Sequence, residues 1–274
     1  MLKKIAAIHD LSGIGRCSLT AAIPILSALK TQCCPFPTAI LSSQTGYPKY
    51  SFLDFTDHMR EYSNVWSELN INFDYIYSGF LGSKDQVDIV IDFIKKNNNS
   101  FVIVDPVMGD NGNMYSIFDN DMCKKIKNLV KISNLTTPNI TEACLLTNRS
   151  ISDIGDLTKK DIINMAKEIS ELGPENVIIT GVVQDGYILN IGYDKISDNC
   201  FITSFEYNNL SYSGTGDIFT SIICGLIANG HDLEFAINKS SYFVHKVVNY
   251  TSKFDTDRND GIMFEYFLNE LTRL

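Results

Sequence analysis

Phe101-Val102-Ile103-Val104-Asp105 is a nearly continuous apolar run that ends in a carboxylate. Runs of this kind are typical of a strand that is buried on both faces of a parallel sheet. Residues 106–110 follow with a proline, a glycine and a second carboxylate. Because a buried carboxylate is costly unless it is paired or binds a cation, the end of this strand is a candidate functional site.

Short strand-like runs alternate with helix-like periodicity along the chain. Strands are predicted at Lys4–His9, Phe36–Leu41, Phe73–Ser78, Phe101–Asp105, Leu135–Thr137, Val177–Thr180, Gly186–Gly192 and Phe201–Tyr207, the last two as an antiparallel edge pair. Helices are predicted at Ser18–Leu29, Asp54–Leu69, Ser83–Ile94, Met122–Ile132, Thr141–Leu146, Thr158–Gly173, Gly216–Ala228, Leu233–Tyr250 and Gly261–Leu271. This alternation predicts a mostly parallel sheet with helices on both faces, in which ligands bind at the carboxyl ends of the strands.

Composition and charge describe an ordinary globular protein of 274 residues, with 45% hydrophobic and 20% charged residues. They predict a single α/β domain over residues 1–274. The 23 Lys and Arg residues against 32 Asp and Glu give a net charge of −9, which disfavours a nucleic-acid partner. No apolar run approaches the roughly 20 residues of a membrane span. Seven cysteines without a C-x-x-C pair predict free thiols, no zinc site and a cytoplasmic protein.

A candidate anion-binding segment is Ser213-Gly214-Thr215-Gly216-Asp217, which is followed at once by apolar helical residues. Two glycines around one small residue expose successive backbone N–H groups at a helix N-terminus, where phosphate charge is stabilised. Asp217 then has two explanations. It is either a carboxylate that caps the helix or a general base beside a phosphoryl group that is transferred.

Two more predicted strands lead into loops that carry carboxylates. Asp105 and Asp110 lie around one strand end, where Mg²⁺ or a monovalent cation is a natural partner. The stretch Thr137–Asn139 leads to Glu142, which either caps the following short helix or faces a phosphate-bound metal. Neither loop has the G-x-x-x-x-G-K-[ST] pattern, which excludes a P-loop nucleotide-binding protein.

Two loops lie near the start of the chain. Residues 9–16 contain a G-x-G without a third glycine at the dinucleotide spacing, and no acidic residue ends the next strand. A nicotinamide-binding site is therefore disfavoured. Ser42–Tyr47 is a polar turn, either a plain loop or part of a binding site. Of the four histidines, only His9 lies at a strand end where a substrate would bind, and the other three are expected at the surface or in packing contacts.

Taken together, these segments resemble the ribokinase-like small-molecule kinases, and among them the vitamin B6 kinases. The resemblance extends from about Lys4 to about Thr251. Its specific elements are D-P-V-M-G-D at Asp105–Asp110, T-P-N-x-x-E-A at Thr137–Ala143 and G-T-G-D at Gly214–Asp217. Ser43–Tyr47 resembles the substrate-side turn of pyridoxal kinases. Several motifs in the family's order are far more specific than any one of them.

The resemblance implies a fold and a reaction. The fold is a three-layer α/β/α sandwich around a central, mainly parallel sheet, usually in a homodimer. The reaction is ATP-dependent phosphorylation of the 5′-hydroxymethyl group of pyridoxal, pyridoxine or pyridoxamine, with Asp217 as the general base. The amides of Gly214, Thr215 and Gly216 would stabilise the phosphoryl group during its transfer.

The resemblance also implies roles for individual residues on both sides of the site. Besides the three cradle residues, those implied to bind ATP are Asp105, Asp110, Tyr115, Asn139, Glu142 and Thr180. The implied metal ligands are Asp110 and Glu142 for Mg²⁺, and Asp105, Thr137 and Thr180 for a monovalent cation, which is expected to be K⁺. The implied substrate contacts are His9, Ser12, Thr45, Gly46, Tyr47 and Asp217.

Two departures from the family pattern and two rival functions remain. The loop His9–Ser18 is not the sequence typical of animal pyridoxal kinases, so His9, Asp10 and Ser12 are alternative substrate contacts. The segment Asp110–Tyr115 is short for the family's flap over the nucleotide. Hydroxymethylpyrimidine (phosphate) kinase, a close relative on the same fold, commonly has G-T-G-C where this chain has G-T-G-D. A non-catalytic vitamin B6-binding protein is the other alternative.

Overall fold

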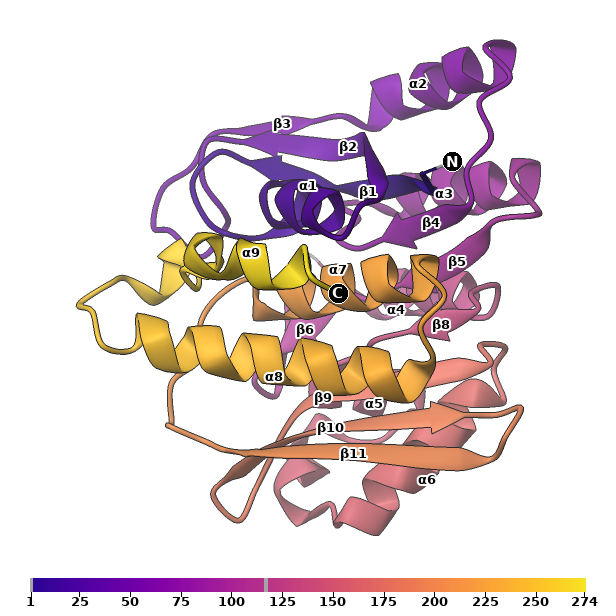
Figure 1. Ribbon diagram of the computed structural model, residues 1–274. Helices are drawn as coiled ribbons and strands as arrows, with labels where there is room; N and C mark the ends of the chain where they lie inside the picture. The colour runs from indigo at the N-terminus through magenta and orange to yellow at the C-terminus, as the bar shows by residue number, and fades with distance from the viewer. Residues whose placement is uncertain (1, 116–117) are drawn as a thin grey trace.

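The structure, a computed structural model, describes residues 2–115 and 118–274. Its parallel strands are β1 (Lys4–Ser12), β2 (Gln32–Leu41), β4 (Tyr75–Ser78), β5 (Phe101–Val104), β8 (Leu135–Thr136) and β9 (Asn176–Gln184). The antiparallel strands at the two edges are β3 (Phe52–Asp54), β10 (Tyr187–Asp194) and β11 (Asn199–Glu206). They form one nine-stranded sheet in the order β11-β10-β9-β8-β5-β4-β1-β2-β3 (Figure 1).

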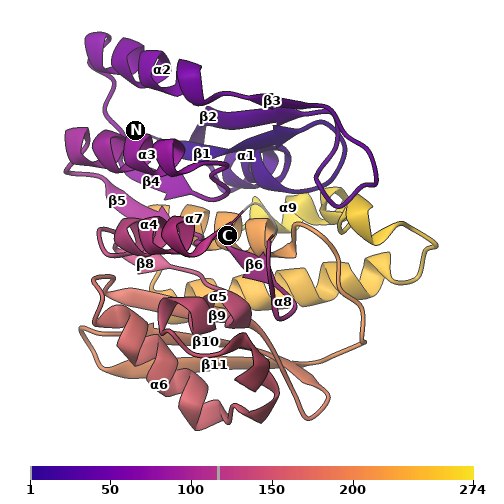
Figure 2. The ribbon, with the colours of Figure 1, turned by 180° about the vertical axis from the view of Figure 1, so that it is seen from behind.

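Helices cover both faces of this sheet, as Figures 1 and 2 show from opposite sides. One face carries α1 (Ser18–Ala28), α7 (Thr215–Ala228), α8 (Leu233–Thr251) and α9 (Leu268–Leu271). The other carries α2 (Thr56–Glu68), α3 (Lys84–Lys96), α4 (Asn120–Val130), α5 (Ile140–Leu146) and α6 (Lys159–Ser170). The predicted three-layer α/β/α architecture with a mainly parallel sheet is confirmed. No helix in residues 2–115 and 118–274 is long and apolar enough to cross a membrane.

Strand β5 shows why the sequences of the central strands are nearly continuous apolar runs. Its side chains alternate between two core clusters, with Val102 and Val104 in one and Ile103 in the other. Both clusters lie under helices, so every residue of such a strand must be apolar. Phe36 on β2 anchors the first cluster, and Tyr77 on β4 lies in the second.

Local capping signals start two of the predicted helices. The hydroxyl of Ser83 accepts the backbone N–H of Gln86, and α3 begins directly after it. Thr158 and Asp161 form a reciprocal capping box at the start of α6. Each hydroxyl satisfies an N–H group that the first turn of a helix would otherwise leave open.

The predicted helix over Gly261–Leu271 is confirmed only at its end, where α9 spans Leu268–Leu271. Gly261 has a φ of +75°, and the chain then forms a short 3₁₀ turn at Phe264–Phe267 before α9. Phe264 is 2% exposed, so its burial in the core sets the path of this segment instead of helical periodicity. The sequence also did not indicate β3, the hairpin β6 (Gly109–Asp110) and β7 (Asn113–Met114), or the 3₁₀ turns at Ile151–Asp156 and Arg258–Asp260.

Strand order places the functional edge of the sheet. The chain leaves β1 toward β2 in one direction and crosses back to β4 on the other side of β1. In open α/β sheets this reversal opens a crevice at the carboxyl ends of the strands, where ligands bind. These ends lie toward the left of Figure 1, together with the start of α7 and the loop between α8 and α9.

We expect Phe36→Ala to lower the free energy of unfolding by about 3–5 kcal/mol, because it removes a fully buried ring. The Phe36 ring centroid lies 5.3 Å from Tyr62, 5.5 Å from Trp66 and 5.3 Å from Phe93. Urea titration followed by the fluorescence of the single tryptophan measures the loss. Phe52→Ala is the matched control, since Phe52 is 47% exposed. Equal losses for the two variants would contradict this description of the core.

Candidate active site

The N-terminus of α7 leaves its first amides open. Gly214 is the N-cap, with a φ of +78°, and the helix begins at Thr215. The N–H groups of the first turn have no partner within the helix, and the positive end of the helix dipole lies there. Gly216 is exposed, and a Cβ added to it would meet no atom within 4 Å. An anion therefore has both space and hydrogen-bond donors at this point.

Gly214 also brings the start of α7 against the loop that precedes α1. A Cβ at Gly214 would lie 2.1 Å from the carbonyl oxygen of Arg16 and 3.0 Å from the Cα of Cys17. Glycine alone combines the positive φ with so close an approach of two backbones. Since α1 begins at Ser18, directly after this contact, the N-termini of α1 and α7 meet here.

Asp217 lies at this junction of two helix starts. It is the third residue of α7, and the backbone N–H of Ser18 donates to its carboxylate. Burial raises the pKa of Asp217 to about 7; the Ser18 N–H opposes this rise, and the negative charge of Asp10 adds to it. A carboxyl group with a pKa near neutrality is suited to take a proton from a ligand at physiological pH.

Asp10 organises the carboxyl end of β1. Its carboxylate accepts the hydroxyl of Ser12 at 2.7 Å and that of Ser18 at 2.5 Å. Burial raises the pKa of Asp10, and the two hydroxyls oppose the rise. Asp10 keeps 7% of its surface exposed, whereas Ser12 and His9 keep none. Of the three alternative contacts in the first loop, Asp10 is thus the one with open surface.

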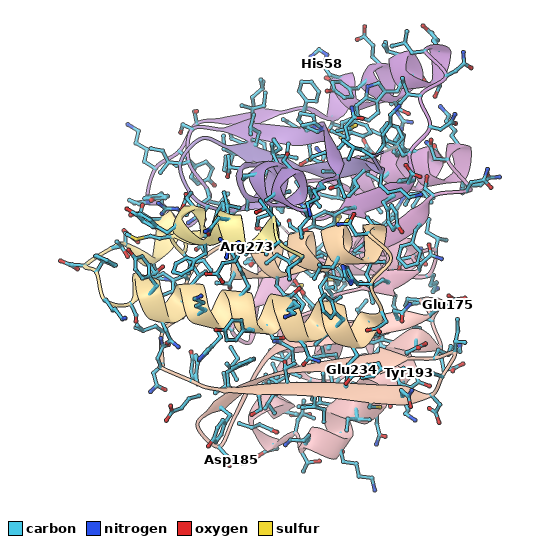
Figure 3. All side chains as sticks on the ribbon, viewed as in Figure 1. His58, Glu175, Asp185, Tyr193, Glu234 and Arg273 are labelled. Carbon is cyan, nitrogen blue, oxygen red and sulfur yellow. The ribbon has the colours of Figure 1, made fainter. Side chains whose placement is uncertain are left out.

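His9 is held inside the fold. Its ring lies edge-on to Tyr77, with centroids 4.2 Å apart, and neither ring nitrogen has a partner among the described residues. Burial lowers the pKa of His9 to about 3, so the ring is neutral. The other histidines lie at the surface or in ring packing, as expected: His58 projects from α2 (Figure 3), and His231 and His245 stack on phenylalanines.

Asp105 lies at the end of β5, deep in the site. Burial raises its pKa well above the usual range; the charges of Glu142 and Asp217 add to the rise, and the hydroxyl of Thr220 opposes it. The same Thr220 hydroxyl donates to the hydroxyl of Thr137 at 3.0 Å. Asp105, Glu142 and Asp217 come from three distant parts of the chain, yet their charges interact at this edge of the sheet.

Glu142 completes a reciprocal capping box at the start of α5. Asn139 accepts the N–H of Glu142 at 3.0 Å, and Glu142 Oε2 accepts the N–H of Asn139 at 2.9 Å. Glu142 Oε1 also accepts the N–H of Met108 at 3.0 Å. Burial still raises the pKa of Glu142 to about 8; the N–H groups of Asn139, Met108 and Gly109 oppose the rise, and the charge of Asp110 adds to it. The cap that the sequence suggested is present, and it holds a carboxyl group that is costly to ionise.

The hairpin of β6 and β7 lies beside α5. Asn139 Nδ2 donates to the carbonyl of Gly109 at 2.7 Å, and the Gly112 N–H donates to the hydroxyl of Thr141 at 3.0 Å. Asp110 on this hairpin is exposed. Tyr115 follows it, and burial raises the Tyr115 pKa, with the charges of Glu142, Asp110, Asp217 and Asp105 adding to the rise. The hairpin thereby brings Tyr115 to the same cluster of carboxylates.

Thr180 joins the site from β9. It pairs with Asn139 through an isolated parallel bridge, and its N–H donates to the carbonyl of Pro138 at 2.9 Å. Gly181, with a φ of +66°, follows it directly. The backbone of β9 therefore lies against the residues that lead into α5.

The turn after β2 is attached to the C-terminal loop. Gln44 Nε2 donates to Asn259 Oδ1 at 3.0 Å, and the hydroxyl of Tyr47 donates to Asp260. The hydrogen bond to Asp260 raises the pKa of Tyr47 to about 12. Thr45 and Gly46 remain exposed between these two attachments. The predicted substrate turn thus has a fixed frame and an open tip.

Several residues of this site were not predicted from the sequence. They are Ser18, Arg16 and the C-terminal residues Arg258, Asn259 and Asp260, which contact motif residues from far along the chain. The backbone N–H of Arg16 donates to the carbonyl of Asp260 at 3.2 Å. Gly261 is the residue whose type reflects this contact between the C-terminal loop and Arg16, because a Cβ there would lie 2.9 Å from the Arg16 Cβ.

Comparison with known proteins gives one consistent family. A family model described as phosphomethylpyrimidine kinase matches residues 19–262. One similar solved structure is a crystal structure with pyridoxal of a protein from Bacteroides thetaiotaomicron that is assigned to the phosphomethylpyrimidine kinases. Its sequence is 40% identical, its TM-score is 0.94, and the match covers 99% of this chain and 96% of that one. Pyridoxal kinase of Dictyostelium discoideum is 24% identical over 275 residues, 92% of this chain and 87% of the relative. Hydroxymethylpyrimidine/phosphomethylpyrimidine kinase of Aquifex aeolicus is 26% identical over 176 residues, 64% and 67% of the two chains. The resemblance to ribokinase-like kinases is confirmed.

Gly214→Ala should lower the free energy of unfolding by about 1–3 kcal/mol, because it combines a strained φ with a collision against the Arg16 carbonyl. Gly216→Ala is the matched control, two residues away and with open space around its Cβ. It should change stability by no more than about 0.5 kcal/mol. Chemical denaturation of both variants measures the difference, and equal stabilities would remove the proposed contact between the two helix starts.

Proposed function

The chain belongs to the phosphomethylpyrimidine kinase family, and from this premise we propose that it phosphorylates a vitamin B6 compound. The proposed reaction transfers the γ-phosphoryl group of ATP to the 5′-hydroxymethyl group of pyridoxal, pyridoxine or pyridoxamine. One observation carries the proposal: Asp217, with a pKa of about 7, lies at the open N-terminus of α7. Transfer of a phosphoryl group to an alcohol needs a base and a site for phosphate charge at one place.

The proton and the phosphoryl group move in opposite directions. The substrate hydroxyl gives its proton to Asp217 while the hydroxyl oxygen bonds to the γ-phosphorus. At the same time, the bond between the γ-phosphorus and the oxygen that leaves with ADP breaks. The backbone N–H groups of Thr215 and Gly216, next to the N-cap Gly214, face the charge that spreads over the transferred group. They need no rearrangement, because the Gly214 contact already fixes the start of α7.

The residues on the nucleotide side fit a Mg²⁺ ion that arrives with the triphosphate. Glu142 is buried, and its pKa of about 8 means that a nearby cation would favour its ionised form. Its Oε1 accepts the N–H of Met108 and its Oε2 that of Asn139, and a lone pair remains for a bridging water. Asp110 offers a second, exposed carboxylate. When bound, Mg²⁺ would neutralise part of the triphosphate charge, and Glu142 and Asp110 would help to hold it.

A monovalent cation fits beside Asp105, and we propose K⁺. Asp105 has no lysine or arginine partner within the described residues, and its raised pKa shows how costly its charge is without a cation. Thr137 and Thr180, the other proposed ligands, offer uncharged oxygen atoms from the adjoining strands. Oxygen ligands with a single buried negative charge suit a cation that is weakly held.

On the substrate side, the open tip at Thr45 and Gly46 is the proposed edge of the pyridine site. Tyr47 and Gln44 hold this tip through the C-terminal loop. The relative from Bacteroides thetaiotaomicron, 40% identical, was crystallised with pyridoxal, which supports a B6 compound as the substrate. Asp10 accepts the hydroxyl of Ser18. In the first loop it replaces His9 and Ser12 as the proposed polar contact with the substrate.

A second candidate is hydroxymethylpyrimidine or its phosphate as the substrate, because a kinase of that specificity matches 64% of the chain. The feature that favours vitamin B6 is Asp217, where that branch commonly has cysteine. A coupled ADP-release assay with pyridoxal, pyridoxine, pyridoxamine and hydroxymethylpyrimidine decides between them. The proposal requires the highest kcat/KM for a B6 compound. Turnover of the pyrimidine alone supports the second candidate, and no turnover of any of the four supports a binding protein.

We expect Asp217→Asn to fold normally, to bind ATP and pyridoxal, and to lose about 10²–10⁴ in kcat. A primary alcohol holds its proton too tightly to attack phosphorus at neutral pH without a base. Asparagine keeps the size of the side chain, so the helix start and its amides should survive. A kcat within about threefold of the parent would exclude the general base.

Stability of the same variant separates a base from a helix cap. The pKa of Asp217 is about 7 in the folded protein, against 3.8 for an ordinary aspartate carboxyl, the value expected in the unfolded chain. The folded state therefore loses stability as the pH rises from about 4 to about 7, and Asp217→Asn removes that loss. Its melting temperature at pH 8 should equal or exceed that of the parent. A lower melting temperature at pH 8 would indicate a capping role.

Glu142→Gln should raise the Mg²⁺ concentration that gives half-maximal turnover and lower kcat, while pyridoxal binding stays nearly intact. The matched control is Asp161→Asn, which alters the equivalent acid of the capping box at α6, away from the site. Both variants weaken a cap, so both should lose about 1 kcal/mol of stability. Only Glu142→Gln should change the Mg²⁺ titration, and identical titrations for both would reduce Glu142 to a helix cap.

A further inference from the structure

The candidate site has a strong excess of negative charge. Asp10, Asp105, Asp110, Glu142 and Asp217 all lie at this edge of the sheet, where their charges interact. A nucleoside triphosphate would add further negative charge. A cation supplied by the protein would offset part of it, and two arginines, Arg16 and Arg258, lie near the cradle.

Arg16 is near the cradle, but its charge is already paired. Its Nε donates to Glu265 at 2.6 Å, and its Nη1 donates to the carbonyl of Asp260 at 3.2 Å. These contacts direct the side chain toward the C-terminal turns. Arg16 therefore serves to fasten the C-terminal loop rather than to bind an anion.

Arg258 lies on that same C-terminal loop, directly against the cradle. Its carbonyl accepts the backbone N–H of Ser213, the residue before Gly214, at 3.1 Å. The loop that carries it, between α8 and α9, lies on the side of the molecule where α7 begins (Figure 1). The backbone of Arg258 is thus next to the anion cradle, although the two are more than forty residues apart in the sequence.

The position of Arg258 is fixed by its neighbours. Asn259 is held by Gln44 at 3.0 Å, and Asp260 is held by Tyr47 and by the backbone N–H of Arg16. These hydrogen bonds tie the loop to the turn after β2 and to the start of α1. Arg258 is therefore placed by the fold and not by a mobile segment.

The side chain of Arg258, by contrast, is free. It is exposed, and its guanidinium forms no hydrogen bond or ion pair with any residue in 2–115 or 118–274. Its positive charge interacts with the carboxylate of Asp110, on the hairpin of β6 and β7. Arg258 lies between α8 and α9, and Asp110 lies on the hairpin of β6 and β7.

We propose that Arg258 binds the phosphoryl group that is transferred at the N-terminus of α7. This inference rests on the proposed function and adds to it a residue that no motif contains. Guanidinium groups bind phosphate oxygens through two parallel hydrogen bonds, and they stay charged at every physiological pH. The phosphoryl group in question is the γ-phosphate of the nucleotide before transfer and the 5′-phosphate of the product after it.

Equilibrium binding to the full-length protein tests the proposal without relying on turnover. Four ligands are titrated in the presence of Mg²⁺: the ATP analogue AMP-PNP, ADP, pyridoxal 5′-phosphate and pyridoxal. Arg258→Gln should weaken AMP-PNP and pyridoxal 5′-phosphate on the order of tenfold to a hundredfold, the usual effect of losing a hydrogen bond to a charged group. ADP and pyridoxal lack the transferred group and should change less than about twofold.

Two further variants serve as controls. Arg258→Lys keeps the charge but not the paired donors, so it should recover part of the lost affinity. Arg273→Gln removes another exposed arginine, near α9 and away from the strand ends (Figure 3), and should leave all four affinities unchanged. Melting temperatures of the Arg258 variants should match the parent, because the side chain has no described partner.

The outcomes separate this inference from the proposed function. Weakening of AMP-PNP alone, or of pyridoxal 5′-phosphate alone, supports the inference and identifies the source of the phosphoryl group. Unchanged affinity for both, or an equal loss for ADP and pyridoxal, overturns it. If AMP-PNP binding depends on Arg258 but no B6 compound is phosphorylated, the proposed function fails while the inference stands. If the parent binds neither phosphorylated ligand, both fail.

Discussion

The contact between Gly214 and the backbone of Arg16 is the constraint on which the site depends. It brings the starts of α1 and α7 together, with a Cβ at Gly214 excluded by the Arg16 carbonyl at 2.1 Å. Only because the two helices meet does the Ser18 N–H reach the carboxylate of Asp217. The open amides of α7 and a carboxyl group of near-neutral pKa then share one place, although neither feature alone distinguishes a kinase from an ordinary helix start.

The fold was largely predictable because its signals are local. Ser83 and Thr158 cap helices through N–H groups three residues away, and the apolar run at Phe101–Asp105 marks a strand covered on both faces. Local periodicity failed at Gly261–Leu271, where a positive φ and the burial of Phe264 override it. Tertiary packing decides such a segment, and no spacing rule contains that information.

Prediction of the site had a similar limit. The motifs identified carboxylates at strand ends, and Asp105, Glu142 and Asp217 do interact electrostatically. The attachment of Tyr47 to Asp260 joins residues 213 positions apart, so nothing near either residue predicts it. The interior position of His9 was missed for a related reason, since a strand end looks open in a sequence whether or not neighbouring side chains cover it. Contacts between distant loops, rather than motifs, give this site its frame.

Asp217 is held as a base of near-neutral pKa at a phosphate cradle, and this property underlies the proposed reaction. The most direct measurement is an NMR titration of the side-chain carboxyl carbon in protein labelled with ¹³C-aspartate, with the signal assigned by its absence in Asp217→Asn. We expect a midpoint close to 7 in the free protein. A midpoint near the ordinary value of 3.8 would contradict it, because Asp217 would then be a solvated helix-cap carboxylate.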